Sequence, residues 1–151
     1  MADRLHDALD RAMVQLFRLR GVLDSSQAAA GLGMSVSEAM ALRYLANGPS
    51  TQQELGSYLA LEKSTVSRLV DAMVSKGWVG KERDPDNRRY LMVTLTEAGI
   101  AAAASVAEAM RQRHSGMLEA LSGEELQALA VALPALVRVL SDDPGSPQTR
   151  D

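Results

Sequence analysis

A cluster of hydrogen-bond donors and cations stands near the middle of this 151-residue chain. Its members are Lys63, Ser64, Thr65, Ser67 and Arg68. Their ammonium, hydroxyl and guanidinium groups are the ones that proteins use to bind phosphates and base edges. Short hydroxyl residues are poor helix formers, so their gathering in one place needs a reason other than helix stability. A merely solvated helix face could have the same composition, and the elements around the cluster decide between the two interpretations.

The cluster lies on one face of a helix that the sequence predicts from Lys63 onward. Apolar residues follow at the i, i+3, i+4, i+7 spacing of a buried stripe. They are Val66, Leu69, Val70, Met73 and Val74. The donors fall on the opposite face together with Asp71, with Thr65 on its flank, and Gly77 ends the helix.

A shorter helix is predicted just before this one, and its start is marked by a capping box. The hydroxyl of Thr51 can accept from the backbone N–H of Glu54, and the Glu54 carboxylate can reach back to the N–H of Thr51. The two helices are separated by a tight turn at Ala60. The order is therefore helix, turn, helix, with the donor cluster on the second helix.

A two-stranded hairpin is predicted after the second helix. Trp78 and Val79 begin the first strand, and residues 90–95 alternate as its antiparallel mate. The turn formers of residues 84–87 lie between the strands and display Arg88 and Arg89 at the tip. A helix-turn-helix followed by a hairpin is the layout of a winged helix, which presents one helix to a DNA major groove and a charged loop beside it.

Residues 51–95 resemble the DNA-binding domain of the MarR family of bacterial transcription regulators. That family carries a run similar to LxxSTVSRLVDxLxxKGxV, a wing ending in D-x-R, and a V-x-LT-x-x-G junction. The chain matches at residues 62–71, 76–79, 89 and 93–99. Two positions depart from the pattern: Asn87 stands where an acidic residue usually precedes the wing arginine, and Ala60 stands where glycine is common.

The resemblance implies a mainly α fold with a small β-hairpin wing, in which terminal helices dimerise the winged helix-turn-helix domain. It implies a homodimer on double-stranded DNA with a pseudo-palindromic operator, most often as a repressor. The expected DNA contacts are Thr51, Gln52, Lys63, Ser64, Thr65, Ser67, Arg68, Lys76, Arg88 and Arg89.

The resemblance also implies a small amphipathic or phenolic effector that releases the protein from DNA. It would bind in a crevice between the dimer helices and the winged domain. The candidate lining residues are Met13, Phe17, Met40, Arg43, Tyr44, Met110 and His114. The simpler alternative stays open, because Met and aromatic side chains often do no more than fill gaps in a core.

Long helices are predicted on both sides of the winged segment. Capping boxes mark two starts, Ser35 with Glu38 and Ser122 with Glu125, while Thr96 caps the helix after the hairpin and Pro134 should interrupt the last one. We expect one domain over residues 1–141, with the winged helix at about 50–95, dimerisation helices at about 3–26 and 97–141, and a disordered tail at 142–151. A single chain would leave the terminal apolar stripes uncovered, which favours a dimer.

The charge distribution fits this interpretation better than the total charge does. The net charge is −3, yet residues 51–95 hold seven basic and six acidic residues, so the acidic excess lies in the flanks. Residues 51–95 thus carry the positive excess, although a mixed-charge surface alone would not indicate DNA binding. With no apolar leader or long apolar run, we expect a cytoplasmic protein without membrane contact.

The sequence gives little support for catalysis. The chain has no cysteine, and its two histidines, His6 and His114, lie far apart without a metal-ligand spacing, so neither a cofactor nor a metal site is expected. The remaining alternative to a DNA-binding regulator is a winged-helix module that binds protein instead of DNA. Such a module would show aromatic or aliphatic anchors on the exposed face of the second helix, where this chain has short polar side chains.

Overall fold

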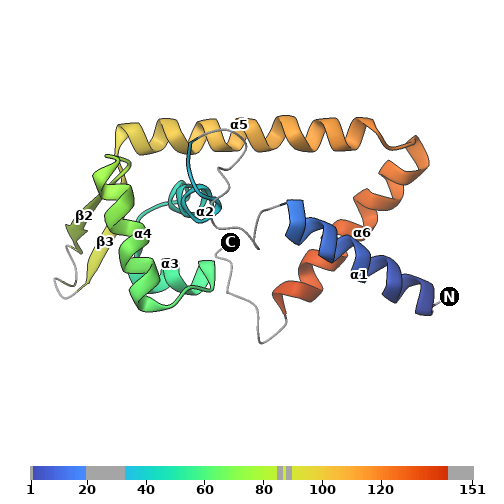
Figure 1. Cartoon of the computed structure of the whole chain (residues 1–151), viewed down its shortest axis with the longest axis horizontal. Helices are drawn as coiled ribbons and strands as arrows, with labels where there is room; N and C mark the ends of the chain where they lie inside the picture. Colours follow the sequence, from blue (N-terminus) through green and yellow to red (C-terminus); the bar gives the residue numbers. More distant parts are fainter. Residues whose placement is uncertain (1, 20–32, 85–86, 88–89, 143–151) are drawn as a thin grey trace.

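The computed structural model describes residues 2–19, 33–84, 87 and 90–142 of the chain. In chain order the elements are α1 (Ala2–Leu19), α2 (Val36–Leu45), β1 (Ser50–Thr51), α3 (Gln52–Leu59), α4 (Lys63–Ser75), β2 (Val79–Arg83), β3 (Leu91–Leu95), α5 (Glu97–Glu119) and α6 (Gly123–Ser141). Figure 1 shows that the middle elements form one body, while α5 runs along it and carries α6 to the other end of the molecule, the end at which α1 also lies. The expected class, mainly α with a small β-hairpin wing, is confirmed.

A small antiparallel sheet closes one side of this body. The strand order is β1-β3-β2, so β3 lies in the centre, with Val79 opposite Leu95 and Arg83 opposite Leu91. The sequence predicts the β2–β3 hairpin and misses β1, which pairs Ser50 with Val93. Because α3 begins directly after β1, the pairing of β1 with β3 fixes the start of α3 against the β2–β3 hairpin.

The hydrophobic core lies between α2, α3, α4, the sheet and the first half of α5. Its fully buried side chains include Leu42 of α2, Leu55 of α3, Met73 of α4 and Val93 of β3. Val106 closes the core from α5. We call this body the winged domain. Because one residue from each element meets in the same core, the position of α4 is fixed by all of its neighbours.

The predicted helix starts are confirmed. The Ser35 hydroxyl accepts from Glu38 N–H at 3.1 Å and the Thr51 hydroxyl from Glu54 N–H at 3.2 Å. Thr96 and Ser122 cap α5 and α6 in the same way. Each cap satisfies a backbone donor that the helix itself leaves unpaired. The predicted interruption at Pro134 is wrong, since α6 is one helix through that residue; proline removes only one backbone donor, and the neighbouring turns keep theirs.

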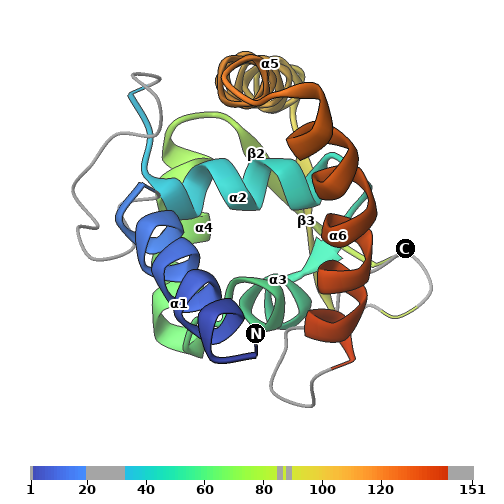
Figure 2. The same ribbon diagram turned by 90° about the vertical axis from the view of Figure 1, so that its right-hand side faces the viewer.

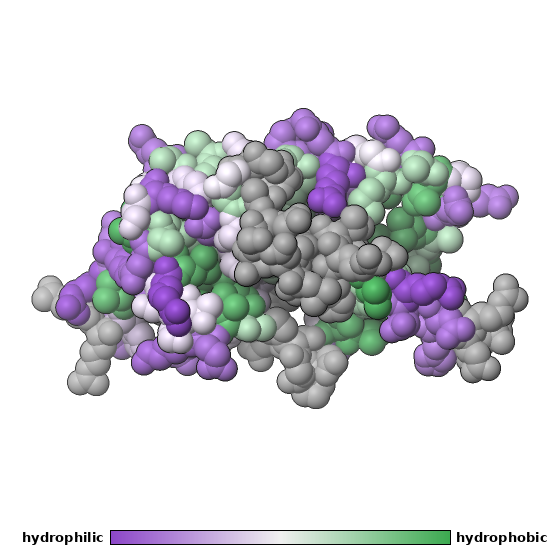
Figure 3. All heavy atoms as spheres, in the orientation of Figure 1, coloured by the Kyte–Doolittle hydropathy of each residue, from purple (hydrophilic) through white to green (hydrophobic). Residues whose placement is uncertain are grey.

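The helices outside the winged domain leave most of their apolar side chains in solvent. In α6 no residue is buried, and Val131 is 78% exposed and Val137 60% exposed. Leu5 and Leu9 of α1 are exposed as well. Figure 2 shows α1 and α6 on two sides of this end of the molecule, and Figure 3 shows hydrophobic residues reaching the surface there. None of the described helices is long and apolar enough to cross a membrane.

Candidate nucleic-acid interface

The donor cluster lies on the outer face of α4, as predicted. Val66, Val70 and Met73 point into the core and are almost completely buried. The opposite face carries Lys63, Ser64, Thr65 and Arg68, all exposed, while Ser67 is half-buried. Because α4 turns one face to the core over its whole length, the polar face is available to a partner over the same length.

One member of the predicted apolar stripe of α4 is not in the core. Val74 is 41% exposed. At about 100° per residue, Val74 lies at the edge of the stripe, roughly 80° around the helix from Val66. The stripe is therefore narrower than the sequence pattern indicates, and its centre runs through Val66, Val70 and Met73.

A strained turn fixes the start of α4 relative to α3. Ala60 ends α3 in the left-handed region at φ 53° and ψ 43°. The chain can then turn sharply, and Leu61 N–H donates to the Gly56 carbonyl at 2.9 Å. A Cβ on Gly56 would lie 3.3 Å from Cγ2 of Val66, so the two helices approach closely at this point. The turn and the close approach together set the angle at which α4 leaves α3.

The C-terminal end of α4 is anchored by backbone hydrogen bonds. Gly77, at φ 73°, donates to Val74, and Trp78 donates to Met73 at 3.0 Å, which is the Schellman arrangement. Thr96, the cap of α5, donates its hydroxyl to the Gly77 carbonyl. The end of α4, the start of β2 and the start of α5 are thus joined at one point.

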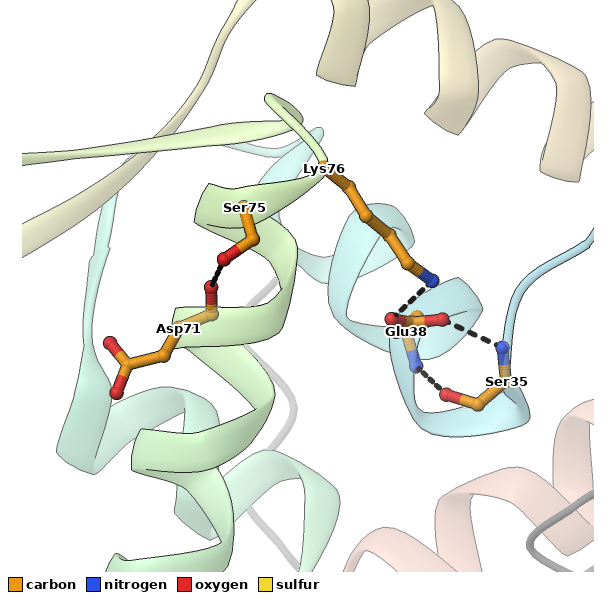
Figure 4. A network of polar contacts seen from close by, with 5 residues as sticks. All are labelled: Ser35, Glu38, Asp71, Ser75 and Lys76. Carbon is orange, nitrogen blue, oxygen red and sulfur yellow. Dashed lines mark hydrogen bonds and ion pairs between the residues drawn. The ribbon is translucent and has the colours of Figure 1, made fainter.

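Lys76 lies at this anchored C-terminal end of α4, far from Lys63 and Ser64 at its start. Its ammonium group contacts the Glu38 carboxylate of α2 at 2.7 Å and stands 4.6 Å from the centroid of the Trp78 ring. Figure 4 shows the Lys76 side chain reaching toward Glu38, which in turn bonds Ser35. Lys76, one of the predicted DNA contacts, thus forms an ion pair within the protein, although its side chain is 39% exposed.

A second ion pair joins α4 to the hairpin. Lys81 of β2 bonds the carboxylate of Asp71 on α4 at 2.5 Å. At the start of the wing loop, Asn87 N–H donates to the Asp84 carboxylate at 3.2 Å, and Tyr90 N–H donates to the Asn87 carbonyl. Arg88 and Arg89 lie outside the described residues, so the predicted position of the wing arginines stays a prediction.

Thr51 and Gln52 stand at the start of α3. The Thr51 hydroxyl accepts from Glu54 N–H and also donates to the Glu54 carboxylate at 3.1 Å. That hydroxyl therefore has a structural role in the cap. Gln52, the first residue of α3, is half-buried. The DNA contacts expected of Thr51 and Gln52 stay predictions.

Four of the seven predicted effector residues line two hollows, and Arg43 belongs to both of them. One, of about 300 Å³, lies between α2 and α5 and brings Arg43, Met110 and His114 together; Arg43 bonds the Met110 sulfur at 3.3 Å. The other, of about 240 Å³, holds Tyr44, which stacks on Tyr58 at 4.4 Å between ring centroids. Met13 and Met40 are half-buried elsewhere, and the Phe17 side chain lies outside the described part.

Sequence reasoning misses three residues of these sites. Lys81 and Tyr58 give no local signal, because their partners Asp71 and Tyr44 lie on other elements. The sequence identifies Glu38 only as a capping residue. Its second contact is with Lys76, 38 positions further along the chain. In the described part of the chain, no group of His, Asp and Glu side chains could hold a metal ion.

Comparisons with known proteins point to one family. The sequence model of the MarR family matches residues 32–89. The uncharacterized HTH-type transcriptional regulator YcgE of Bacillus subtilis (strain 168) is 39% identical over 93 residues, covering 58% of this chain and 60% of YcgE. The HTH-type transcriptional repressor NicR of Pseudomonas putida is 29% identical over 91 residues, covering 60% of this chain and 58% of NicR. The chain thus spans less than two thirds of the length of these curated relatives.

The likeness extends to three dimensions. A crystal structure of a probable transcriptional regulator from Pseudomonas aeruginosa superposes with a TM-score of 0.66 at 28% identity, covering 87% of this chain and 98% of that structure. The superposition therefore takes in almost all of that structure, beyond the segment that the family model matches.

Proposed function

This chain belongs to the MarR family, whose members are transcriptional regulators and not enzymes, and we propose that it is a dimeric regulator that binds a specific DNA sequence. The observation that carries the proposal is the outer face of α4. Lys63, Ser64 and Arg68 are exposed there, on a helix whose other face is locked into the core. A rigid helix with an outward donor face can enter a major groove without reorganisation.

The uncovered apolar side chains of α1 and α6 support a homodimer. Exposed valines and leucines on two long helices leave a hydrophobic surface that a monomer cannot bury. A two-fold partner would cover it and would hold two copies of α4 on a pseudo-palindromic site. Such a regulator works in the cytoplasm, beside the DNA.

Repression is the proposed mode of action. NicR, a relative, is a repressor, and the chain resembles a family in which repressors are common. A dimer seated on an operator blocks access to the promoter.

A small phenolic or amphipathic effector is the proposed signal for release. The hollow between α2 and α5 offers Arg43 for an acidic group and Met110 for an aromatic ring. With 4-hydroxybenzoate as the probe, we expect operator affinity to fall in the wild type and in Arg113→Met, and to stay unchanged in Arg43→Met. If 4-hydroxybenzoate lowers the operator affinity of wild type and of Arg43→Met equally, the effector does not bind in this hollow.

The DNA-binding proposal is tested by selecting bound duplexes from a random library and measuring affinity at several salt concentrations. Counterion release predicts that log affinity falls linearly with log salt. Arg68→Ala should weaken binding by about 1–3 kcal/mol. Arg113→Ala is the matched control, because Arg113 is also exposed but lies on α5. If no duplex is recovered, or if both variants weaken binding equally, DNA is not the partner of α4.

A further inference from the structure

The Lys76 ammonium group is held on two sides within the winged domain. It is 2.7 Å from Oε1 of Glu38 and 4.6 Å from the centroid of the Trp78 ring. Glu38 belongs to the first turn of α2, and Trp78 directly precedes β2. One side chain at the end of α4 therefore connects α4 to two other elements (Figure 4).

The Glu38 carboxylate depends on this contact. Glu38 is only 5% exposed, and its two oxygens are both used: Oε2 accepts from the Ser35 N–H at 2.8 Å and Oε1 from Lys76. A carboxylate removed from water is costly unless a cation and hydrogen bonds compensate it. Lys76 supplies the cation, so the charge attraction favours one position of the α4 end on α2.

We infer that Lys76 is a positioning residue for the recognition helix, and that it does not neutralise a DNA phosphate. The inference rests on the proposed DNA-binding function and deepens it, because it names what orients α4 in the groove. The residue acts through Glu38 and Trp78, which its ammonium group contacts while the side chain stays 39% exposed.

The geometry explains why such an anchor would affect specificity. α4 has 13 residues and is therefore about 20 Å long. A tilt of about 5° at the Lys76 end moves the Lys63 end by nearly 2 Å, whereas hydrogen bonds tolerate only a few tenths of an ångström. Contacts to base edges would be lost, while the longer-ranged attraction of cations to phosphates would persist.

The test compares Lys76→Met, Lys76→Arg and Glu38→Gln with wild type on the selected operator and on a scrambled duplex, over a range of salt. Glutamine keeps the capping box of α2 and removes only the charge. Lys63→Met serves as the reference for a phosphate contact. Thermal unfolding of each variant shows that binding is measured on folded protein.

We expect Lys76→Met and Glu38→Gln to weaken operator binding at least about tenfold and scrambled-duplex binding less than about twofold, since only base readout is lost. The salt slope should stay at the wild-type value, and Lys76→Arg should restore most of the operator affinity. Lys63→Met should instead weaken both duplexes and reduce the slope, by about 1.8 for two phosphates per dimer.

Two results would overturn the inference while leaving the proposed DNA binding in place. If Lys76→Met reduces the salt slope as Lys63→Met does, Lys76 is a phosphate contact. If Glu38→Gln leaves operator binding equal or tighter, freeing the ammonium group does not disorient α4. Wild-type protein that binds no duplex would overturn the proposed function itself, and with it the inference, so the two failures are distinguishable. If Lys76→Met fails to fold, Glu38→Gln and Lys76→Arg still decide the question.

Discussion

Ala60 is the one residue other than glycine with a positive φ in the described part of the chain. Its Cβ crowds the following carbonyl in the left-handed region, which costs about 1–2 kcal/mol for an L-residue. Replacing Ala60 with glycine removes that strain at the turn between α3 and α4. We expect Ala60→Gly to raise the free energy of unfolding by about 0.5–1 kcal/mol, measured by urea or thermal unfolding.

A second alanine gives the control. Ala46 is also exposed and also ends a helix, but its φ of −63° is right-handed. Glycine there relieves no strain and adds freedom to the unfolded chain, so Ala46→Gly should destabilise by about 0.5–1 kcal/mol. Equal effects of the two substitutions would show that the left-handed turn stores no strain.

The prediction for the wing concerns Arg89. An arginine at a hairpin tip can reach a narrow A·T-rich minor groove, where the negative potential is strongest. Arg89→Ala should therefore weaken DNA binding by about 1–3 kcal/mol, with the largest loss on operators that have A·T-rich flanks. Titrations on duplexes that differ only in their flanks measure this. An affinity that does not change on any flank would mean that the wing does not read the groove.

The substitution Asn87→Asp tests whether the side chain at position 87 orients the Arg89 guanidinium group. A carboxylate would hold a guanidinium group more firmly than an amide would, but it adds a negative charge near phosphate. Because the family usually has an acidic residue here, we expect equal or tighter binding on the same duplex. Weaker binding would mean that repulsion from phosphate outweighs the brace.

At this scale the sequence predicts side chains whose partners are near in the chain. The capping residues and the outward face of α4 follow from local spacing, and they are found where expected. Lys76 is different. The sequence pattern predicts only that Lys76 is exposed, and it does not predict the contacts of its ammonium group with Glu38 and with the Trp78 ring. Contacts between elements depend on how the helices pack, which periodicity does not encode.

At the scale of the elements, Gly99 marks the closest approach found at any described glycine. A Cβ at this position would lie 1.8 Å from the Trp78 carbonyl oxygen. Gly99→Ala must therefore push the first turn of α5 away from the start of β2. We expect it to lower the free energy of unfolding by more than about 3 kcal/mol, or to prevent folding, as measured by denaturant unfolding.

Gly116 is the matched control on the same helix. A Cβ there would meet nothing within 4 Å. Alanine is a better helix former than glycine, so Gly116→Ala should stabilise the protein by up to about 1 kcal/mol. If Gly99→Ala proves as mild as Gly116→Ala, α5 and β2 do not touch in solution.

The elements themselves are largely predictable, because four of the helix starts carry a capping residue with a defined spacing. β1 is missed because two residues are too few to show alternation, and only pairing with β3 makes them a strand. The exposed Val74 is misassigned because periodicity gives the direction of a stripe but not its width.

At the scale of the whole molecule, the exposed face of α6 carries the dimer prediction. Val131 and Val137 are the two most exposed large apolar side chains of that helix. Placing a carboxylate at both positions would bury two charges in any interface they form. We expect Val131→Glu with Val137→Glu to raise the dimer dissociation constant at least about hundredfold, near 3 kcal/mol, in sedimentation equilibrium.

Gln127→Glu tests whether charge on α6 alone has this effect. Gln127 is exposed on the same helix, and the change adds a carboxylate without removing an apolar group. It should leave the dimer intact. A double variant that remains as dimeric as wild type would place the interface elsewhere on the chain.

The length of α5 ties the reading of DNA to the far end of the molecule. Its first turns are part of the winged core through Ala103 and Val106, while residues 111–119 stand clear of that core and lead to α6. Over the 23 residues of α5, about 35 Å, a change of roughly 5° in its tilt displaces the winged domain by about 3 Å. That distance is close to the rise of one base pair along the duplex. In the proposed dimer, the packing of α6 would therefore set, to within about one base pair, the half-site spacing that the two recognition helices can bridge.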